Sequence, residues 1–164
     1  MKIVDKIFGN IFVGILLLVA VTAFIFSHSV VSADVSSGES GKVVDIVKDV
    51  MESVNVEVDE NVIVKTVRKT AHFSEFFALG AVCYYLRFII SKHPTKGFSL
   101  GALYGFLIAL VDESLQYNSI GRSPEVLDVW IDVLGFSFSY FAFMLVFALI
   151  SKRLISSRAA RQES

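Results

Sequence analysis

The chain has 164 residues, of which 54% are hydrophobic and 19% are charged, with 15 phenylalanines and only 2 prolines. Soluble domains average about 45–50% apolar and about 25% charged residues, so this balance fits a membrane helix bundle better than a soluble core. The net charge of −1 lacks the basic excess of a nucleic-acid-binding protein, so no nucleic-acid partner is expected. The length predicts one domain over residues 1–164, and the single Cys83 excludes an internal disulfide.

Four apolar runs are each long enough to cross a bilayer, which takes about 20 helical residues. Helices are expected because hydrocarbon offers no other partner to backbone N–H and C=O groups. We therefore predict an all-α membrane protein, built as a four-transmembrane-helix bundle. The spans are expected at residues 7–26, 71–90, 98–117 and 126–150.

The segment between the first two spans, residues 27–67, has a different composition. Its first part, residues 27–41, is rich in serine and glycine and predicts a loop. The next part predicts an outer amphipathic helix, because apolar residues recur there at helical spacing. This helix would lie on the membrane surface, pack against the bundle, or form a lid over the polar residues described below. Its apolar positions are Val43, Ile46, Val47, Val50, Met51 and Val54. Apolar and acidic residues alternate around Val56 and Val58, so a short extended stretch after this helix is an alternative.

Lysine and arginine indicate the orientation, because cytoplasmic loops of membrane proteins are enriched in both. With a cytoplasmic N-terminus, the inner side holds nine of the 15 basic residues and only the acids Asp5 and Glu163. Both termini are therefore predicted inside. The first run also resembles a signal peptide ending near Val31-Ser32-Ala33. A retained helix is favoured, because the run of about 20 residues exceeds the usual h-region of about 7–15.

Polar side chains gather at the predicted outer end of three spans. A charge at the centre of a membrane helix costs about 3 kcal/mol or more, so such a cluster is a functional-site hypothesis. Residues four apart share a helix face. The groups are Arg68 with His72 and Glu75, Asp112 with Gln116, Asp128 with Asp132, and the further residues Glu113 and Arg122.

The direction in which Glu113 faces and the position of Arg122 depend on local backbone geometry. Glu113 is about 100 degrees around the helix from Asp112, so the two need not face the same way. The triplet Ser123-Pro124-Glu125 is typical of a helix start, with a capping serine and an early proline. The short link before it, residues 119–122, would hold Arg122 beside the carboxylates.

These residue types permit three chemistries and one purely structural role. The carboxylates and the histidine could hold a divalent cation, although no cofactor or metal is identified by the residues. They could perform acid–base catalysis, with Glu75, Asp112, Glu113, Asp128 and Asp132 as candidates. They could instead bind an anion, with Arg68, His72, Gln116 and Arg122 as contacts. The structural alternative is an interhelical salt-bridge network that sets the helix register.

Several short motifs resemble the VanZ-like family. They are Arg68-Lys69-Thr70-Ala71-His72-Phe73-Ser74-Glu75, then Asp112-Glu113-Ser114-Leu115-Gln116, then Gly121-Arg122, and finally Asp128-Val129-Trp130-Ile131-Asp132 with Gly135. Their order and spacing are those of the family pattern. The N-terminal third matches less well, because His28 stands in Phe26-Ser27-His28-Ser29 where relatives often carry glutamine. Gly97, Gly101 and Gly105 lie outside these motifs and indicate close helix packing.

The resemblance implies a protein of the bacterial cytoplasmic membrane that acts in the cell envelope. The family takes its name from a glycopeptide-resistance cluster, so the expected function is resistance to teicoplanin and related lipoglycopeptides. An outer-face polar site would then bind an anionic membrane lipid or lipid-linked envelope component. The alternative is an intramembrane enzyme that acts on a lipid-linked phosphate or glycan. The sequence leaves open which of the two holds, and it indicates no oligomeric state.

Overall fold

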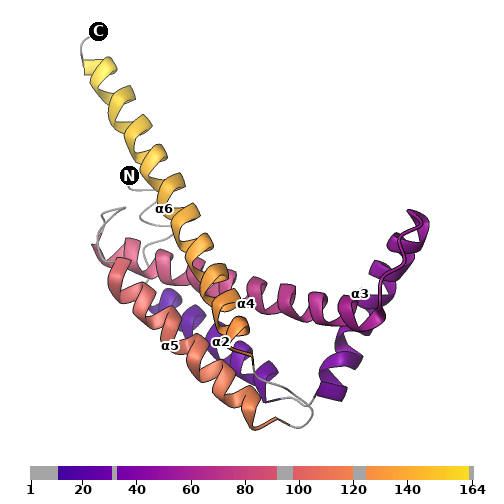
Figure 1. Ribbon diagram of the computed structural model, residues 1–164. Coiled ribbons are helices and arrows are strands. Elements are labelled where there is room, and N and C mark those ends of the chain that lie inside the picture. The colour runs from indigo at the N-terminus through magenta and orange to yellow at the C-terminus, as the bar shows by residue number, and fades with distance from the viewer. Residues whose placement is uncertain (1–10, 31–32, 92–97, 120–124, 163–164) are drawn as a thin grey trace.

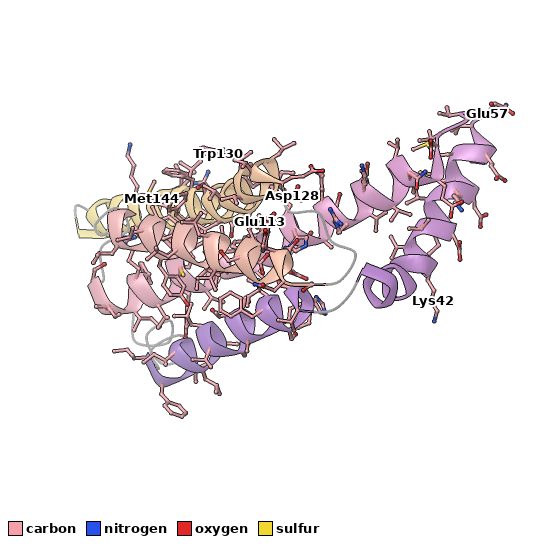
Figure 2. The ribbon with its side chains drawn as sticks, turned by 60° about the horizontal axis from the view of Figure 1, so that its bottom comes forward. Lys42, Glu57, Glu113, Asp128, Trp130 and Met144 are labelled. Carbon is pink, nitrogen blue, oxygen red and sulfur yellow. The ribbon has the colours of Figure 1, made fainter. Side chains whose placement is uncertain are left out.

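The computed structural model describes residues 11–30, 33–91, 98–119 and 125–162, and all regular structure in these ranges is helical. The helices in chain order are α2 (Ile11–Ser29), α3 (Ala33–Ser53), α4 (Glu60–Ser91), α5 (Phe98–Tyr117) and α6 (Val126–Gln162). Helices α2, α4, α5 and α6 pack together as a bundle (Figure 1). Helix α3 and the first turns of α4 project from one side of it (Figure 2). The predicted all-α class is confirmed.

Three of the described helices are long and apolar enough to cross a membrane: α2, α4, and α6 from Val126 to Arg153. Helix α5 has the bounds predicted for the third span, Phe98–Tyr117. Its last turns carry Asp112, Glu113 and Gln116, and it is not among the three. The structure therefore supports a helical membrane protein, and the four-span bundle stays a prediction.

The loop predicted over residues 27–41 is wrong for most of its length. Helix α2 continues to Ser29, and α3 already begins at Ala33. A polar helical turn has no apolar periodicity, so the spacing of valines located only the later part of α3. The chain leaves α3 through Asn55, whose φ of 55° is the left-handed conformation that asparagine tolerates. Residues 56–59 after it form no strand.

Helix α4 begins at Glu60, well before the predicted start of the span at Ala71. Asp59 caps it, because its Oδ1 accepts a hydrogen bond of 2.8 Å from the backbone N–H of Asn61. At the other end of the chain, α6 starts at Val126 as predicted but continues beyond Ile150 to Gln162. Hydropathy had marked the apolar part of each helix and missed its polar extension.

The backbones of α4 and α6 approach closely at two glycines. A Cβ added at Gly80 would collide with the carbonyl oxygen of Phe136, and one at Gly135 would collide with that of Phe73. Small residues permit this kind of approach between membrane helices. Phe73 follows His72 directly, and Asp132 lies one turn before Phe136. The close crossing therefore brings the polar residues of α4 and α6 together.

The predicted glycine stripe of α5 also packs against α6. A Cβ at Gly101 would lie 3.0 Å from the Tyr140 ring, and one at Gly105 would lie 2.7 Å from the Phe136 ring. Gly97 is outside the described residues. Phe136 and Tyr140 are fully or almost fully buried in the core between the helices. Gly101 and Gly105 thus allow α5 to pack closely against α6, as predicted.

Candidate functional site

The polar residues expected at one end of the helices do gather there. The end of α2, the middle of α4, the end of α5 and the start of α6 all contribute to them. Five of these side chains are buried in the described structure: His72, Asp112, Gln116, Asp128 and Asp132. Burial of charged groups is costly unless each is paired, so the partners of each side chain decide its role.

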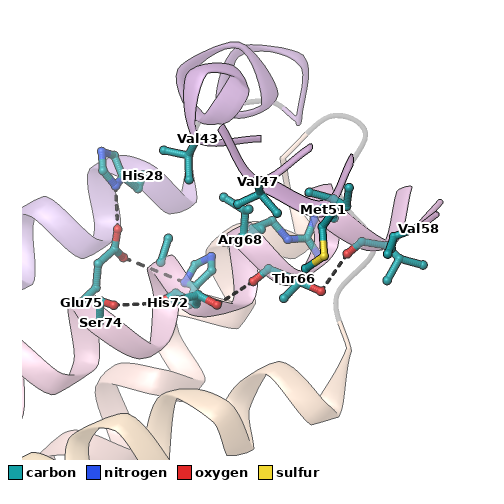
Figure 3. Close-up of a pocket in the computed structure, with 15 residues that line it drawn as sticks. His28, Val43, Val47, Met51, Val58, Thr66, Arg68, His72, Ser74 and Glu75 are labelled. Carbon is teal, nitrogen blue, oxygen red and sulfur yellow. Dashed lines mark hydrogen bonds and ion pairs between the residues drawn. The ribbon is translucent and has the colours of Figure 1, made fainter. Parts of the chain in front are cut away.

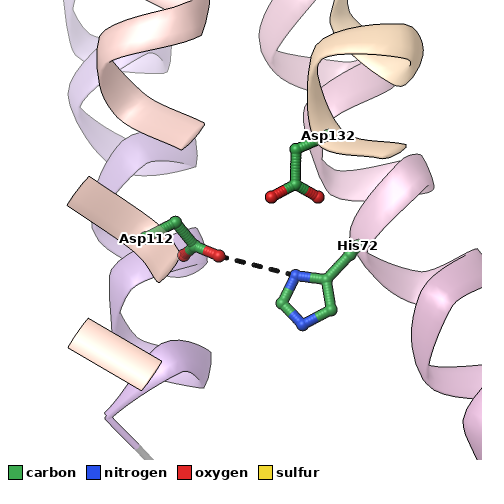
Figure 4. Close-up of side chains that lie close together, drawn as sticks. All are labelled: His72, Asp112 and Asp132. Atoms are coloured by element: carbon green, nitrogen blue, oxygen red, sulfur yellow. Dashed lines mark ion pairs between the residues drawn. The ribbon is translucent and has the colours of Figure 1, made fainter. Parts of the chain in front are cut away.

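Three of the buried residues form an inner cluster of His72, Asp112 and Asp132, one from each of α4, α5 and α6 (Figure 4). Each offers one donor atom, and these atoms all lie within 4.8 Å of one another. His72 Nδ1 is 3.6 Å from Asp112 Oδ2. The sequence grouped these residues only as members of a larger set, whereas the fold separates them from the rest.

Asp112 is fully buried and is held by neutral hydrogen-bond donors. Ser29 Oγ donates to its Oδ1, and Gln116 Nε2 donates to its Oδ2 over 2.8 Å. Gln116 Nε2 also lies 3.5 Å from His72 Nε2. Ser119 Oγ in turn donates to the backbone oxygen of Ser29 over 2.7 Å. Sequence reasoning missed Ser29, and the only available signal was its place in the serine-rich stretch after the first span.

Asp132 differs from Asp112 in its partners. It is 1% exposed, and neither carboxylate oxygen has a hydrogen-bond partner within the described residues. Its side chain points between Asp112 and His72 (Figure 4). A buried carboxylate in this condition calls for a proton or a ligand, because its desolvation is otherwise not compensated.

A second, outer cluster consists of Arg68, Lys69, Glu125 and Asp128. Lys69 Nζ lies 2.7 Å from Asp128 Oδ1 and 3.1 Å from Glu125 Oε2, and Arg68 Nη2 lies 3.7 Å from Asp128 Oδ2. The hydrogen bond and positive charge of Lys69 lower the pKa of the exposed Glu125 carboxyl. Sequence reasoning missed Lys69, although it is adjacent to Arg68 in the basic motif. Asp128 is thus a paired residue, despite sharing a face with Asp132.

Glu75 connects the inner cluster to helix α2. Its Oε1 lies 2.8 Å from His28 Nδ1, and its Oε2 lies 4.0 Å from His72 Nδ1 (Figure 3). His28 therefore contacts a residue of the predicted site. Glu113 is half-buried beside Asp112 on α5. Arg122, the remaining predicted site residue, lies outside the described residues.

A groove of about 700 Å³ runs between α3 and α4 and ends at this site. Its walls are apolar for most of their length, and its polar end is formed by Arg68, His72 and Glu75 (Figure 3). The apolar lining includes Val43, Val47 and Met51 of α3 and Ile63 and Val67 of α4. An amphiphile with an apolar chain and a charged head matches this lining.

Comparison with known proteins identifies one family. The family model described as VanZ/LLP1 matches residues 12–148, which is most of the chain. No curated protein and no solved structure matches the chain. The matched range contains every residue of the inner and outer clusters.

Proposed function

Since the chain belongs to the VanZ/LLP1 family, we propose that it acts in the bacterial cell envelope by binding an anionic, lipid-linked component. The observation that carries this proposal is the groove between α3 and α4. It joins a long apolar wall to a polar end at Arg68 and His72, so one molecule could place its chain and its head in the two parts. Ligand sites of this kind combine apolar walls with a few placed polar groups.

Arg68 is the proposed contact for the anionic head. Its guanidinium carries five N–H donors and makes one ion pair, at 3.7 Å, within the described structure. The side chain is 25% exposed and lines the groove. A phosphate could therefore accept hydrogen bonds from the guanidinium N–H groups that Asp128 does not use, in the two-pronged geometry that arginine favours. His72 and Gln116 would support the head from deeper in the site, and Arg122 is proposed as a further contact.

Helix α3 is proposed to lie at the membrane surface and to cover the lipid chain. The predicted apolar face of α3 contributes Val43, Val47 and Met51 to the groove, and four residues of the face, Val43 included, are exposed at helical spacing. The exposed residues are Val43, Ile46, Val50 and Val54. An exposed apolar stripe on a helix with a charged opposite face is typical of interfacial helices.

The proposed topology places both termini in the cytoplasm and the site at the outer face. The excess of lysine and arginine at the opposite ends of the helices supports this orientation. An outer site that binds a lipid-linked precursor could change how a lipophilic glycopeptide reaches its target. Teicoplanin resistance is therefore the proposed physiological readout.

Lipid binding can be tested by native mass spectrometry of the full chain in detergent. A polyprenyl phosphate and phosphatidylglycerol serve as anionic probes, and phosphatidylcholine serves as the zwitterionic control. We expect retention of the anionic probes and at least a tenfold loss in Arg68→Ala. Lys65→Ala is the matched control, since Lys65 is an exposed cation on the same helix outside the groove. Equal retention of all three lipids would refute the proposal.

The cellular role can be tested by teicoplanin susceptibility in a sensitive Gram-positive host. Expression of the chain should lower susceptibility, Arg68→Ala should abolish the effect, and Lys65→Ala should preserve it. Immunoblots of membranes must show equal abundance, because loss of a buried pair can cost about 3–5 kcal/mol and remove the protein.

A second candidate, an intramembrane enzyme acting on a lipid-linked phosphate, is favoured by the inner cluster. His72 lines the groove and also lies 3.6 Å from Asp112, so a base and an acid would stand at the polar end. Thin-layer chromatography of a radiolabelled polyprenyl phosphate incubated with the protein would show a product. Asp132→Asn should then abolish turnover while lipid retention persists.

A further inference from the structure

We propose that His72, Asp112 and Asp132 bind one divalent transition-metal ion. The proposal goes beyond lipid binding, because the three donors come from the interior of the bundle and need no lipid to assemble. Imidazole and carboxylate together suit ions such as Mn²⁺ and Zn²⁺, whereas Mg²⁺ and Ca²⁺ prefer oxygen donors alone. A set of three protein ligands is also common where a metal keeps one open position.

The spacing of the donors matches a shared ion. Two ligands that each lie about 2.1 Å from a tetrahedral metal are about 3.4 Å apart. His72 Nδ1 and Asp112 Oδ2 are 3.6 Å apart, and all three donor atoms lie within 4.8 Å of one another. The His72–Asp112 pair is already close to that separation, and side-chain rotation would bring the more distant donor to coordination distance. The three residues stand on separate helices, so the fold itself assembles the set.

Asp132 is the independent sign of a ligand. Its carboxylate is 1% exposed, has no hydrogen-bond partner within the described residues, and points into the space between His72 and Asp112. Its neighbour Asp128 has Lys69 and Arg68 as counter-charges. A dication between Asp112 and Asp132 would offset the charges of two buried carboxylates, and it would give Asp132 the partner that its oxygens lack among the described residues.

The surroundings hold the donors in place, as outer partners do in metal sites. Ser29 and Gln116 hydrogen-bond to the two oxygens of Asp112 and fix its orientation. The contacts at Gly80 and Gly135 fix α4 against α6, and hence His72 against Asp132. Glu75 Oε2, 4.0 Å from His72 Nδ1, stands on the side that faces the groove. That side is where the open position of the metal would lie.

Metal content tests the proposal directly. The full chain, purified in detergent and treated with chelator, is incubated with Mn²⁺ or Zn²⁺ and desalted. Elemental mass spectrometry should then find one ion per chain, and Mn²⁺ should show the electron paramagnetic resonance signal of an immobilised ion. Asp132→Asn and His72→Gln should each weaken binding at least tenfold. Two such variants are used so that a fold defect in one leaves the other as a test.

Two acid-to-amide controls accompany these variants. Asp128→Asn alters a buried carboxylate one turn from Asp132, and Asp49→Asn alters an exposed one on α3. Both should bind the metal like the wild type. Absence of a bound ion in folded wild-type protein would overturn the proposal. So would equal binding by Asp132→Asn and the wild type.

The metal and lipid proposals can fail separately. Metal is measured without lipid, and Arg68→Ala should lose lipid while it keeps the ion. A protein that binds metal but no anionic lipid would retain this inference and remove the proposed function. A protein that binds anionic lipid but no metal would retain the proposed function and overturn this inference. It would show that the residues of the inner cluster share a proton and hold no ion.

Discussion

Asp128 and Asp132 lie one turn apart on α6, yet they belong to different regions with different electrostatics. In the outer cluster, Lys69 and Arg68 face Asp128 and neutralise it. In the inner cluster, Asp132 faces Asp112 and His72, and its oxygens have no hydrogen-bond partner among the described residues. The comparison shows that spacing alone cannot separate structural from functional carboxylates. What separates them is the set of charges that neighbouring helices bring to each one.

The largest effect is expected from breaking the crossing that creates both clusters. Gly80→Val should lower the free energy of unfolding by about 3 kcal/mol, because its side chain collides with the Phe136 carbonyl. Thermal unfolding in detergent measures this, and metal binding should be lost with it. Gly41→Ala is the control, since a Cβ there meets nothing within 4 Å. A stable Gly80→Val protein would show that the two helices do not need this contact.

The outer cluster should respond strongly to loss of its lysine. Lys69→Met should cost about 2–3 kcal/mol, because Asp128 then stays buried with only the more distant Arg68 as partner. The double variant Lys69→Met with Asp128→Asn should recover part of that loss. Thermal unfolding of the four proteins in this cycle gives the coupling. No coupling between the two positions would mean that the ion pair does not stabilise the fold.

Without metal, a substitution in the inner cluster should not destabilise the protein, unlike the loss of Lys69 from the outer cluster. In chelated protein, Asp132→Asn should leave stability unchanged or raise it by about 1 kcal/mol, since it removes an uncompensated buried charge. Saturating metal should reverse this order, because only the wild type is stabilised by ligand binding. Thermal unfolding with and without Zn²⁺ checks both arms. Strong destabilisation of the chelated variant would instead assign Asp132 a structural role.

The smallest effect concerns the exposed carboxyl of Glu125, whose pKa is lowered by Lys69. A group with a depressed folded pKa stabilises the protein above its unfolded pKa, about 4.3 for glutamate. That stabilisation disappears as the pH falls through the folded value. Glu125→Gln should therefore lie slightly below the wild type in thermal stability at pH 7 and match it at acidic pH. A difference that grows on acidification would contradict the sign of the shift.

Much of the helical content could be predicted from hydropathy, and the bounds of α5 match the predicted span. The polar ends of helices could not, because α3 and the first turns of α4 carry no continuous apolar signal. A closer reading of Asp59 as a cap would have extended α4 towards its true start. For the site, i,i+4 spacing located His72, Asp112 and Asp132, but it offered no reason to prefer them over Asp128.

The sequence by itself determined the class of the protein, the family motifs and the residues that gather at one end of the bundle. These follow from local composition and helical periodicity, which act over a few turns. Only the tertiary structure decided that Lys69 pairs with Asp128, that Ser29 holds Asp112, and that Asp132 is left facing His72. The first and last of these depend on how closely α4 and α6 approach at Gly80 and Gly135, and the second depends on how α2 packs against α5. The distance between two packed helices is set by side chains from distant segments of the chain, and no local sequence pattern encodes it.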